Sequence, residues 1–156
     1  MERRSLMFIG LGAVLVLLVG TALAAAPTIT GGTLTRGTVG KLSARNDRVT
    51  LKRGIGSADV VVQRFSFQPG SSSGWHKHPG VGVVTVKSGT LQVFNHLCKK
   101  KIYGKGETFV ERGRNHLARN RSNVKAVVIP VFIVPSKTPA NRLFIPLKAP
   151  AGCNVK

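Results

Sequence analysis

Histidine is the residue type whose spacing in this chain most clearly suits chemistry. The sequence has four histidines, and His76 and His78 are separated by a single residue. On a β-strand such side chains leave the same face, so both imidazoles can bind one ion. His116 lies further along the chain, in a second predicted hairpin, and supplies a third imidazole. Because neutral imidazole is the commonest metal ligand among side chains, these three histidines predict a divalent metal site.

Glycines recur at fixed positions around these histidines. The segment Gly70–Gly89 reads Gly-x5-His-Lys-His-x3-Gly-x6-Gly, and the segment Gly113–Asn120 reads Gly-Arg-Asn-His-x3-Asn. The two segments resemble the first motif and the end of the second motif of the cupin superfamily. The resemblance extends from Val60 to Val134, and it rests on glycine turns, histidine spacing and strand pattern that agree in both segments.

The resemblance implies an all-β fold, the cupin-type double-stranded β-helix or jelly-roll barrel, with a divalent metal near its mouth. It also implies that the three motif histidines are metal ligands. The glutamate that the family uses as a further ligand falls at Gly82, which has no side chain. A second departure lies before Gly113, where Glu111 takes the place of the usual proline and the spacing from Gly106 is one residue short.

The missing glutamate changes the electrostatics of the predicted site. Three neutral imidazoles leave the charge of a divalent ion uncompensated, so the site should favour an anionic co-ligand. Glu107, Glu111 or Gln92 could supply a replacement ligand, although side chains of these types are more often exposed. The ligand set does not distinguish Fe, Ni, Mn, Cu or Zn. The alternative is a barrel without an ion, in which backbone groups or water satisfy the imidazoles.

Residues beside the motifs have further assignments. Trp75 and Gln92 are assigned to the ligand pocket, and the alternative for Trp75 is core packing with an exposed indole N–H. His96 lies outside both motifs and is assigned to a loop. Asn120 is expected to make hydrogen bonds in a turn that follows a strand.

The elements that must position these side chains are predicted to be strands. Val, Ile, Thr and Phe are enriched in short runs bounded by glycine or proline, and an apolar period of 3.6 residues does not persist beyond the N-terminal run. The predicted strands are Arg48–Lys52, Ala58–Phe67, Val81–Lys87, Thr90–Phe94, Thr108–Glu111, His116–Asn120 and Val124–Val134. Ser88 and Gly89 predict a hairpin turn between two of them.

The N-terminal residues are interpreted as a targeting segment. Arg3 and Arg4 precede the uncharged apolar run Leu6–Val19, and small residues follow at Ala22–Ala26, as in a secretory signal peptide. An uncleaved membrane anchor is the alternative, since the uncharged stretch is long enough to cross a bilayer. The predicted organisation is a signal peptide at 1–26, an N-terminal arm at 27–57, a barrel at 58–134 and a C-terminal tail at 135–156. The protein is accordingly predicted to be secreted or held in the cell envelope.

Charge excludes some functions and favours others. The chain has 24 Lys and Arg against 5 Asp and Glu, a formal net charge of +19. Mechanisms that need a pair of carboxylates, such as glycoside hydrolysis, are disfavoured, and the sequence lacks a Gly-x-Ser-x-Gly elbow and a phosphate-binding glycine loop.

The basic surface should attract small anions or cell-surface polyanions. Nucleic acid is not expected as a partner, because aromatic residues are not interleaved with the basic ones.

The two cysteines are interpreted as a pair. In an exported protein an even number of cysteines favours a disulfide, so Cys98 and Cys153 should bridge and attach the proline-rich tail to the barrel. Two free thiols, one of them a metal ligand, are the alternative.

Three functions fit these observations. The first is an exported cupin-like protein that binds a divalent metal and a small anionic ligand. The second is a metal-dependent oxygenase of the same fold, and the third is a metal-free module that binds polyanions. The sequence does not decide whether the protein is an enzyme. Pairing of edge strands between two copies would give a homodimer.

Overall fold

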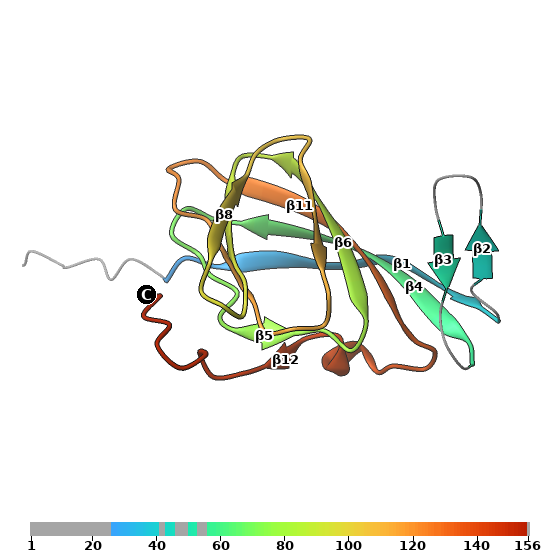
Figure 1. Cartoon of the computed structure of the whole chain (residues 1–156). Coiled ribbons are helices and arrows are strands. Elements are labelled where there is room, and N and C mark those ends of the chain that lie inside the picture. Colours follow the sequence, from blue (N-terminus) through green and yellow to red (C-terminus); the bar gives the residue numbers. More distant parts are fainter. Residues whose placement is uncertain (1–25, 41–42, 46–49, 53–55, 156) are drawn as a thin grey trace, which may run out of the picture.

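The computed structural model describes residues 26–40, 43–45, 50–52 and 56–155, which form antiparallel β-structure (Figure 1). The strands are β1 (Ile29–Val39), β2 (Ser43–Arg45), β3 (Thr50–Lys52), β4 (Ala58–Phe67), β5 (His76–Lys77), β6 (Val81–Ser88), β7 (Leu91–Phe94), β8 (Lys100–Tyr103), β9 (Thr108–Glu111), β10 (Leu117–Arg119), β11 (Ala126–Pro135) and β12 (Ile145–Pro146). One 3₁₀ turn, η1 (Ala140–Arg142), follows β11.

Two sheets face each other across an apolar interior. The larger sheet has the order β1-β4-β11-β6-β9, and the smaller has the order β10-β7-β8. Buried side chains from both sheets meet in one cluster: Phe67, Val84, Val86, Leu91, Phe109, Ala118, Ala126 and Val128. Closing two antiparallel sheets over such a core is the jelly-roll solution to burying one face of each sheet. The expected all-β double-stranded β-helix is therefore confirmed.

Alternation of side chains explains why the central strands form. In β11 the residues Ala126, Val128, Phe132 and Val134 are buried, and the branched or aromatic side chains on both faces suit a pleated strand. β4 spans Ala58–Phe67 and β9 spans Thr108–Glu111, as the sequence predicted. These strands, with β6, form the wall of the barrel beside the histidines.

The predicted hairpin between residues 81–87 and 90–94 is wrong. β6 pairs with β11 and β9 in the larger sheet, whereas β7 pairs with β10 and β8 in the smaller one. Gly89, with φ of 72°, packs against β11, since a Cβ there would lie 2.7 Å from the Lys125 carbonyl oxygen. The turn therefore carries the chain from one sheet to the other. The turn residues alone do not distinguish such a crossing from a hairpin.

Four strands were not predicted from the sequence: β1, β2, β8 and β12; the reasons are clearest for β1 and β8. β1 lies in the segment interpreted as an N-terminal arm, and it pairs with β4 along nearly its whole length as an edge of the larger sheet. Its Gly, Thr and Arg residues are largely exposed, so the apolar alternation that marks a buried strand is absent. β8 contains Lys100 and Lys101, and it is an edge of the smaller sheet. Lysine is common on exposed edges because it discourages pairing with other chains.

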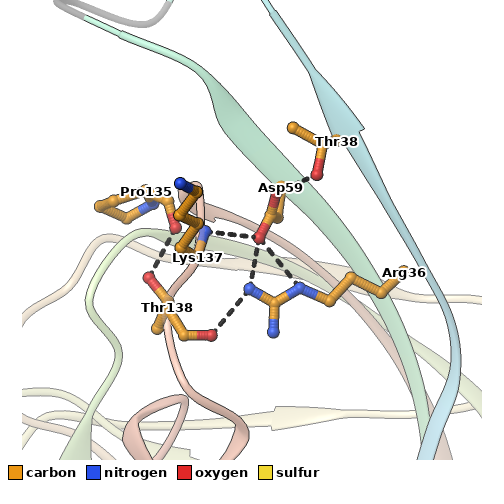
Figure 2. Close-up of polar contacts among 6 residues, drawn as sticks. All are labelled: Arg36, Thr38, Asp59, Pro135, Lys137 and Thr138. Carbon is orange, nitrogen blue, oxygen red and sulfur yellow. Dashed lines mark hydrogen bonds and ion pairs between the residues drawn. The ribbon is translucent and has the colours of Figure 1, made fainter.

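A buried carboxylate joins β1 to the start of the C-terminal tail (Figure 2). Asp59, only 2% exposed, accepts hydrogen bonds from Thr38 Oγ1 at 2.6 Å, Arg36 Nε at 2.9 Å and the Lys137 backbone N–H at 3.0 Å. Arg36 also pairs with Asp59 through Nη2, and the same Nη2 donates to the Thr138 carbonyl at 2.7 Å. One side chain thus satisfies donors from an edge strand and from the tail.

This network makes the stability of the protein sensitive to acid. Hydrogen bonds from Thr38 first and Arg36 next lower the pKa of Asp59 from 3.8 to about 2. Because the folded-state pKa is depressed, the stabilisation is complete above about pH 4 and is lost as the pH falls through about 2. We expect Asp59→Asn to lower the melting temperature at neutral pH, with a difference from wild type that shrinks toward pH 2. Melting curves across this range test the prediction, and a difference that is constant with pH would contradict it.

A disulfide attaches the tail to the barrel, as predicted from the cysteine pair. Cys98 and Cys153 are bridged, with a Cα–Cα distance of 5.6 Å. Cys153 is also buried against Trp75, Phe94 and Leu117. Between β11 and this bridge the tail crosses the end of the barrel, where β12 pairs with β5 (Figure 1). Bridged cysteines are compatible with an extracytoplasmic location.

We expect removal of the disulfide to destabilise the fold. The two cysteines are 55 residues apart, and cross-linking a loop of this size stabilises by about 4 kcal/mol in the chain-entropy model. The Cys98→Ser/Cys153→Ser protein should therefore unfold at lower denaturant than oxidised wild type. Reduced wild type is the matched control and should resemble the variant; an unchanged midpoint in both would show that packing alone holds the tail.

The predicted signal peptide lies outside the described residues. Within the part of the chain that the structure describes, no helix has the length and apolar character needed to span a bilayer.

Candidate metal centre

Backbone pairing brings the three motif histidines together. His76 and His116 form an antiparallel bridge, in which each backbone N–H donates to the carbonyl of the other at 2.9 Å. His78 follows β5 directly, so the alternation of the extended chain returns its side chain toward the same point. All three side chains are buried, and their ligand atoms lie within 4.8 Å of one another. The predicted convergence of residues from distant segments is therefore present.

Each imidazole is fixed by a backbone carbonyl that accepts a hydrogen bond from its Nδ1. The partner is Gly74 for His76 at 3.0 Å, Leu143 for His78 at 2.5 Å and Arg114 for His116 at 2.8 Å. A carbonyl only accepts, so Nδ1 carries a proton in each ring, and in the neutral imidazole Nε2 keeps its lone pair. Anchoring of Nδ1 by a carbonyl is the usual outer-shell arrangement of a metal-binding histidine.

Glu111 also belongs to this cluster, contrary to the expectation that it would be exposed. It lies at the end of β9, is 8% exposed, and directs its carboxylate inward. Its Oε2 lies 3.2 Å from His78 Nε2, and its Oε1 lies 3.1 Å from His116 Nε2. Phe109 and Glu111 lie on the same, buried face of β9. Side-chain alternation could have predicted this burial only if the sequence had also shown which face of the strand is turned inward.

The cluster consists of lone pairs without matching donors. The Nδ1 protons are already used, and Glu111 Oε2 and His116 Nε2 have no aligned hydrogen-bond partner among the described atoms. Buried acceptors that face one another are unfavourable unless a proton or a metal ion lies between them. The residues present therefore fit a bound cation, and His76, His78 and His116 are the group that could hold it.

The pKa shifts of the cluster differ between its members. Burial, followed by the charge of His116, lowers the pKa of His76 from 6.5 to about 3, so this imidazole is neutral at physiological pH. Burial raises the pKa of Glu111, but the contacts with His116 and His78 outweigh it and lower the value to about 2. Burial lowers the pKa of His116, and the Glu111 carboxylate more than compensates, so that its pKa is raised. Glu111 is thus ionised, and among the described residues it is the only carboxylate that contacts the histidines.

An apolar cavity of about 270 Å³ lies on one side of the cluster. It reaches His76, His78 and Glu111 and is otherwise lined mainly by core side chains such as Phe65, Val84 and Leu91. Phe132 and Phe144 cover the two imidazoles: the Phe144 ring stacks on His76 at 4.2 Å, and the Phe132 ring lies 4.4 Å from that of His78. A ligand in this cavity would contact mainly apolar side chains.

A wider, basic cavity opens on the other side. We call it the basic vestibule; it has a volume of about 710 Å³ and reaches Glu111 and His116. Five exposed cationic side chains line it: Lys99, Lys100, Lys101, Arg112 and Arg114. Positive charge around a concave entrance concentrates anions near the histidines.

Other residues singled out in the sequence lie outside the site. Trp75 packs against Phe94, Leu117 and Cys153, and its indole N–H is buried without a partner among the described residues; it lines neither cavity. Gln92 is likewise outside both cavities and accepts a hydrogen bond from Arg119 at 3.2 Å. Glu107 is exposed in a turn, where it accepts the Gly104 N–H at 2.6 Å.

The remaining two polar residues match their assignments. His96 lies in a turn, where its Nε2 accepts a hydrogen bond from Arg114 at 3.1 Å. Asn120 is fully buried, donates to the carbonyls of Phe67 and Val124, and accepts hydrogen bonds from Ser122. Asn120 therefore secures the turn after β10 that follows His116.

Comparison with known proteins supports the same class of fold. Residues 63–133 match the family described as Cupin domain. A Klebsiella pneumoniae protein with a double-stranded β-helix domain superposes with a TM-score of 0.51 at 17% identity, covering 82% of this chain and 90% of that one. A cupin domain from Bordetella pertussis gives a TM-score of 0.42 at 23% identity, covering 62% and 93%. No curated protein matches the chain significantly.

Oxalate oxidase in complex with the substrate analogue glycolate is also similar, with a TM-score of 0.43 and 29% identity over 47% of this chain and 41% of that one. The chain spans less than half the length of the oxalate oxidase structures that it matches. The fold is a small β-barrel of the double-stranded β-helix class, and it contains a three-histidine group that could hold a metal ion. The match over residues 63–133 confirms, for that part of the chain, the resemblance to the cupin superfamily that the two sequence motifs indicated.

Proposed function

We propose that the protein is an exported cupin that binds a divalent metal through His76, His78 and His116, together with a small anionic ligand. The observation that carries the proposal is the state of the three imidazoles. Each Nδ1 is held by a backbone carbonyl, and each Nε2 is left with a lone pair in one buried cluster. When bound, the metal would act as a Lewis acid that holds and polarises an oxygen of the ligand.

The anionic character of the ligand follows from the basic vestibule. Its lysines and arginines surround the approach to His116, and the whole chain has a net charge of +19. These side chains are exposed and would attract and orient an anion before it reaches the histidines. The apolar cavity beyond them has room for a short organic chain, so we propose a small organic anion such as a carboxylate.

A metal-dependent oxygenase is the second candidate, and the apolar cavity favours it. Chemistry with oxygen benefits from a site that excludes water, and Phe132 and Phe144 provide such cover over the histidines. Oxygen consumption by the iron-loaded protein with a panel of small carboxylates and thiols, compared with His116→Ala, distinguishes catalysis from binding.

We expect the purified protein, prepared without chelator, to retain about one divalent ion per chain. His116→Ala should weaken metal binding at least about 100-fold, because even outer-shell changes at metal sites cost 10- to 100-fold. Elemental analysis and competition with a chromophoric chelator measure both effects. His96→Ala is the matched control and should bind like wild type. A folded wild-type protein that takes up neither iron, manganese, nickel, copper nor zinc would overturn the proposal and leave a metal-free polyanion-binding function.

We expect the basic vestibule to strengthen anion binding in a salt-dependent way. Arg112→Gln and Lys101→Gln should each weaken the binding of short carboxylates by about two- to fivefold at low salt, the range for exposed charge pairs. Lys87→Gln, an exposed lysine outside the vestibule, is the control. Isothermal titration of the metal-loaded protein with acetate, malonate and succinate provides the measurement. Equal affinity in all variants would show that the vestibule does not guide the ligand.

A further inference from the structure

We propose that Glu111 is a fourth metal ligand, supplied by β9 in place of the side chain missing from Gly82 on β6. This inference rests on the proposed metal-binding function and specifies its ligand set. The site would then have three histidine ligands and one carboxylate ligand. The carboxylate would come from β9, whereas the sequence motif places its glutamate on β6.

The register of the two strands places Glu111 where a side chain from Gly82 would otherwise lie. Gly82 and Glu111 are directly opposite each other in the β6–β9 pair, and opposite residues direct their side chains to the same face of a sheet. A Cβ built on Gly82 would lie 2.9 Å from Glu111 Oε2 and 2.7 Å from Phe132 Cε1. The carboxylate and the phenyl ring together fill this space, so residue 82 has no room for a side chain.

The contact distances are those of ligand atoms that share an ion. Atoms bound to one small divalent ion at about 2.1 Å lie about 3.0 Å apart in octahedral geometry and about 3.4 Å apart in tetrahedral geometry. Glu111 Oε1 and His116 Nε2 are 3.1 Å apart, and Glu111 Oε2 and His78 Nε2 are 3.2 Å apart. The carboxylate thus contacts one histidine from each of the two motif segments.

The alternative, a purely structural carboxylate, fits the surroundings less well. A buried carboxylate normally receives hydrogen bonds from an arginine, a lysine or backbone N–H groups. Oε2 of Glu111 has no aligned donor among the described atoms, and the imidazoles that it faces have committed their Nδ1 protons to carbonyls. Its neighbour Arg112 is exposed in the basic vestibule. A shared cation would satisfy both the carboxylate and the imidazoles.

Glu111 also changes the expected preference of the site. A carboxylate lowers the charge of the bound centre from +2 to +1, which reduces the need for a strongly anionic co-ligand. An oxygen donor among imidazoles suits divalent manganese, iron, nickel or zinc better than a soft monovalent ion. Glu111 borders both cavities, so an anion from the basic vestibule would meet the metal on the side of Glu111 and His116.

Metal titrations of Glu111→Gln test the inference, with Glu107→Gln as the control that removes the same charge from an exposed turn. We expect Glu111→Gln to bind Zn²⁺ and Mn²⁺ at least about tenfold more weakly than wild type. Its Co²⁺ visible spectrum should also shift, because a charged oxygen donor is replaced. Glu107→Gln should match wild type in affinity and spectrum. If Glu111→Gln also matched wild type in affinity and spectrum, the inference would be overturned.

A measurement on the unaltered site removes any dependence on the folding of Glu111→Gln. The chain has three glutamates, Glu2, Glu107 and Glu111, so carboxyl-labelled glutamate gives few carbon resonances. We expect one resonance to shift in proportion to added Zn²⁺, and to do so equally in the Glu107→Gln protein. If zinc binds and His116→Ala abolishes binding while no glutamate resonance shifts, Glu111 is not a ligand and the three-histidine function stands. If wild type binds no metal, the proposed function itself fails.

Discussion

The central constraint in this structure is a set of buried acceptors that face one another. Three Nε2 lone pairs and one carboxylate meet between the two sheets, and backbone carbonyls hold the Nδ1 atoms so that the rings cannot turn away. Such an arrangement is costly in an empty apolar interior. The antiparallel bridge between His76 and His116, the register of β6 and β9, and the tail carbonyl at Leu143 all serve to maintain it.

The two cavities beside this cluster have different physical character. One is lined mainly by apolar core side chains, and the other is larger and lined by several lysines and arginines. Glu111 belongs to both linings, so it lies between an apolar cavity and an electrostatically positive one. A ligand with a charged group and a short apolar body would find a complementary surface on each side of the boundary.

Much of this arrangement could be predicted from the sequence, and the exceptions have a common cause. Turn residues and side-chain alternation identified β4 and β9, because these signals are local, whereas the resemblance to the cupin motifs identified the histidine cluster. The position of Glu111 depends on which residue of β6 lies opposite it, and the Ser88-Gly89 turn depends on which sheet receives the next strand. Pairing between distant segments determines the position of Glu111 and the course of the turn, and such pairing is not visible in the local sequence. The exposed edge strand β1 was missed because its partner, β4, supplies the buried surface.

The carbonyl that orients His78 comes from Leu143, close to the end of the chain. The barrel strands alone would leave that ring without its hydrogen-bond acceptor. Leu143 is held in place by packing against Val61, Phe132 and Val134, so these contacts also form only when the segment docks. The arrangement of the three rings is therefore completed only when the segment around Leu143 has docked on the barrel. At the proposed metal centre, uptake of an ion would then follow this docking step.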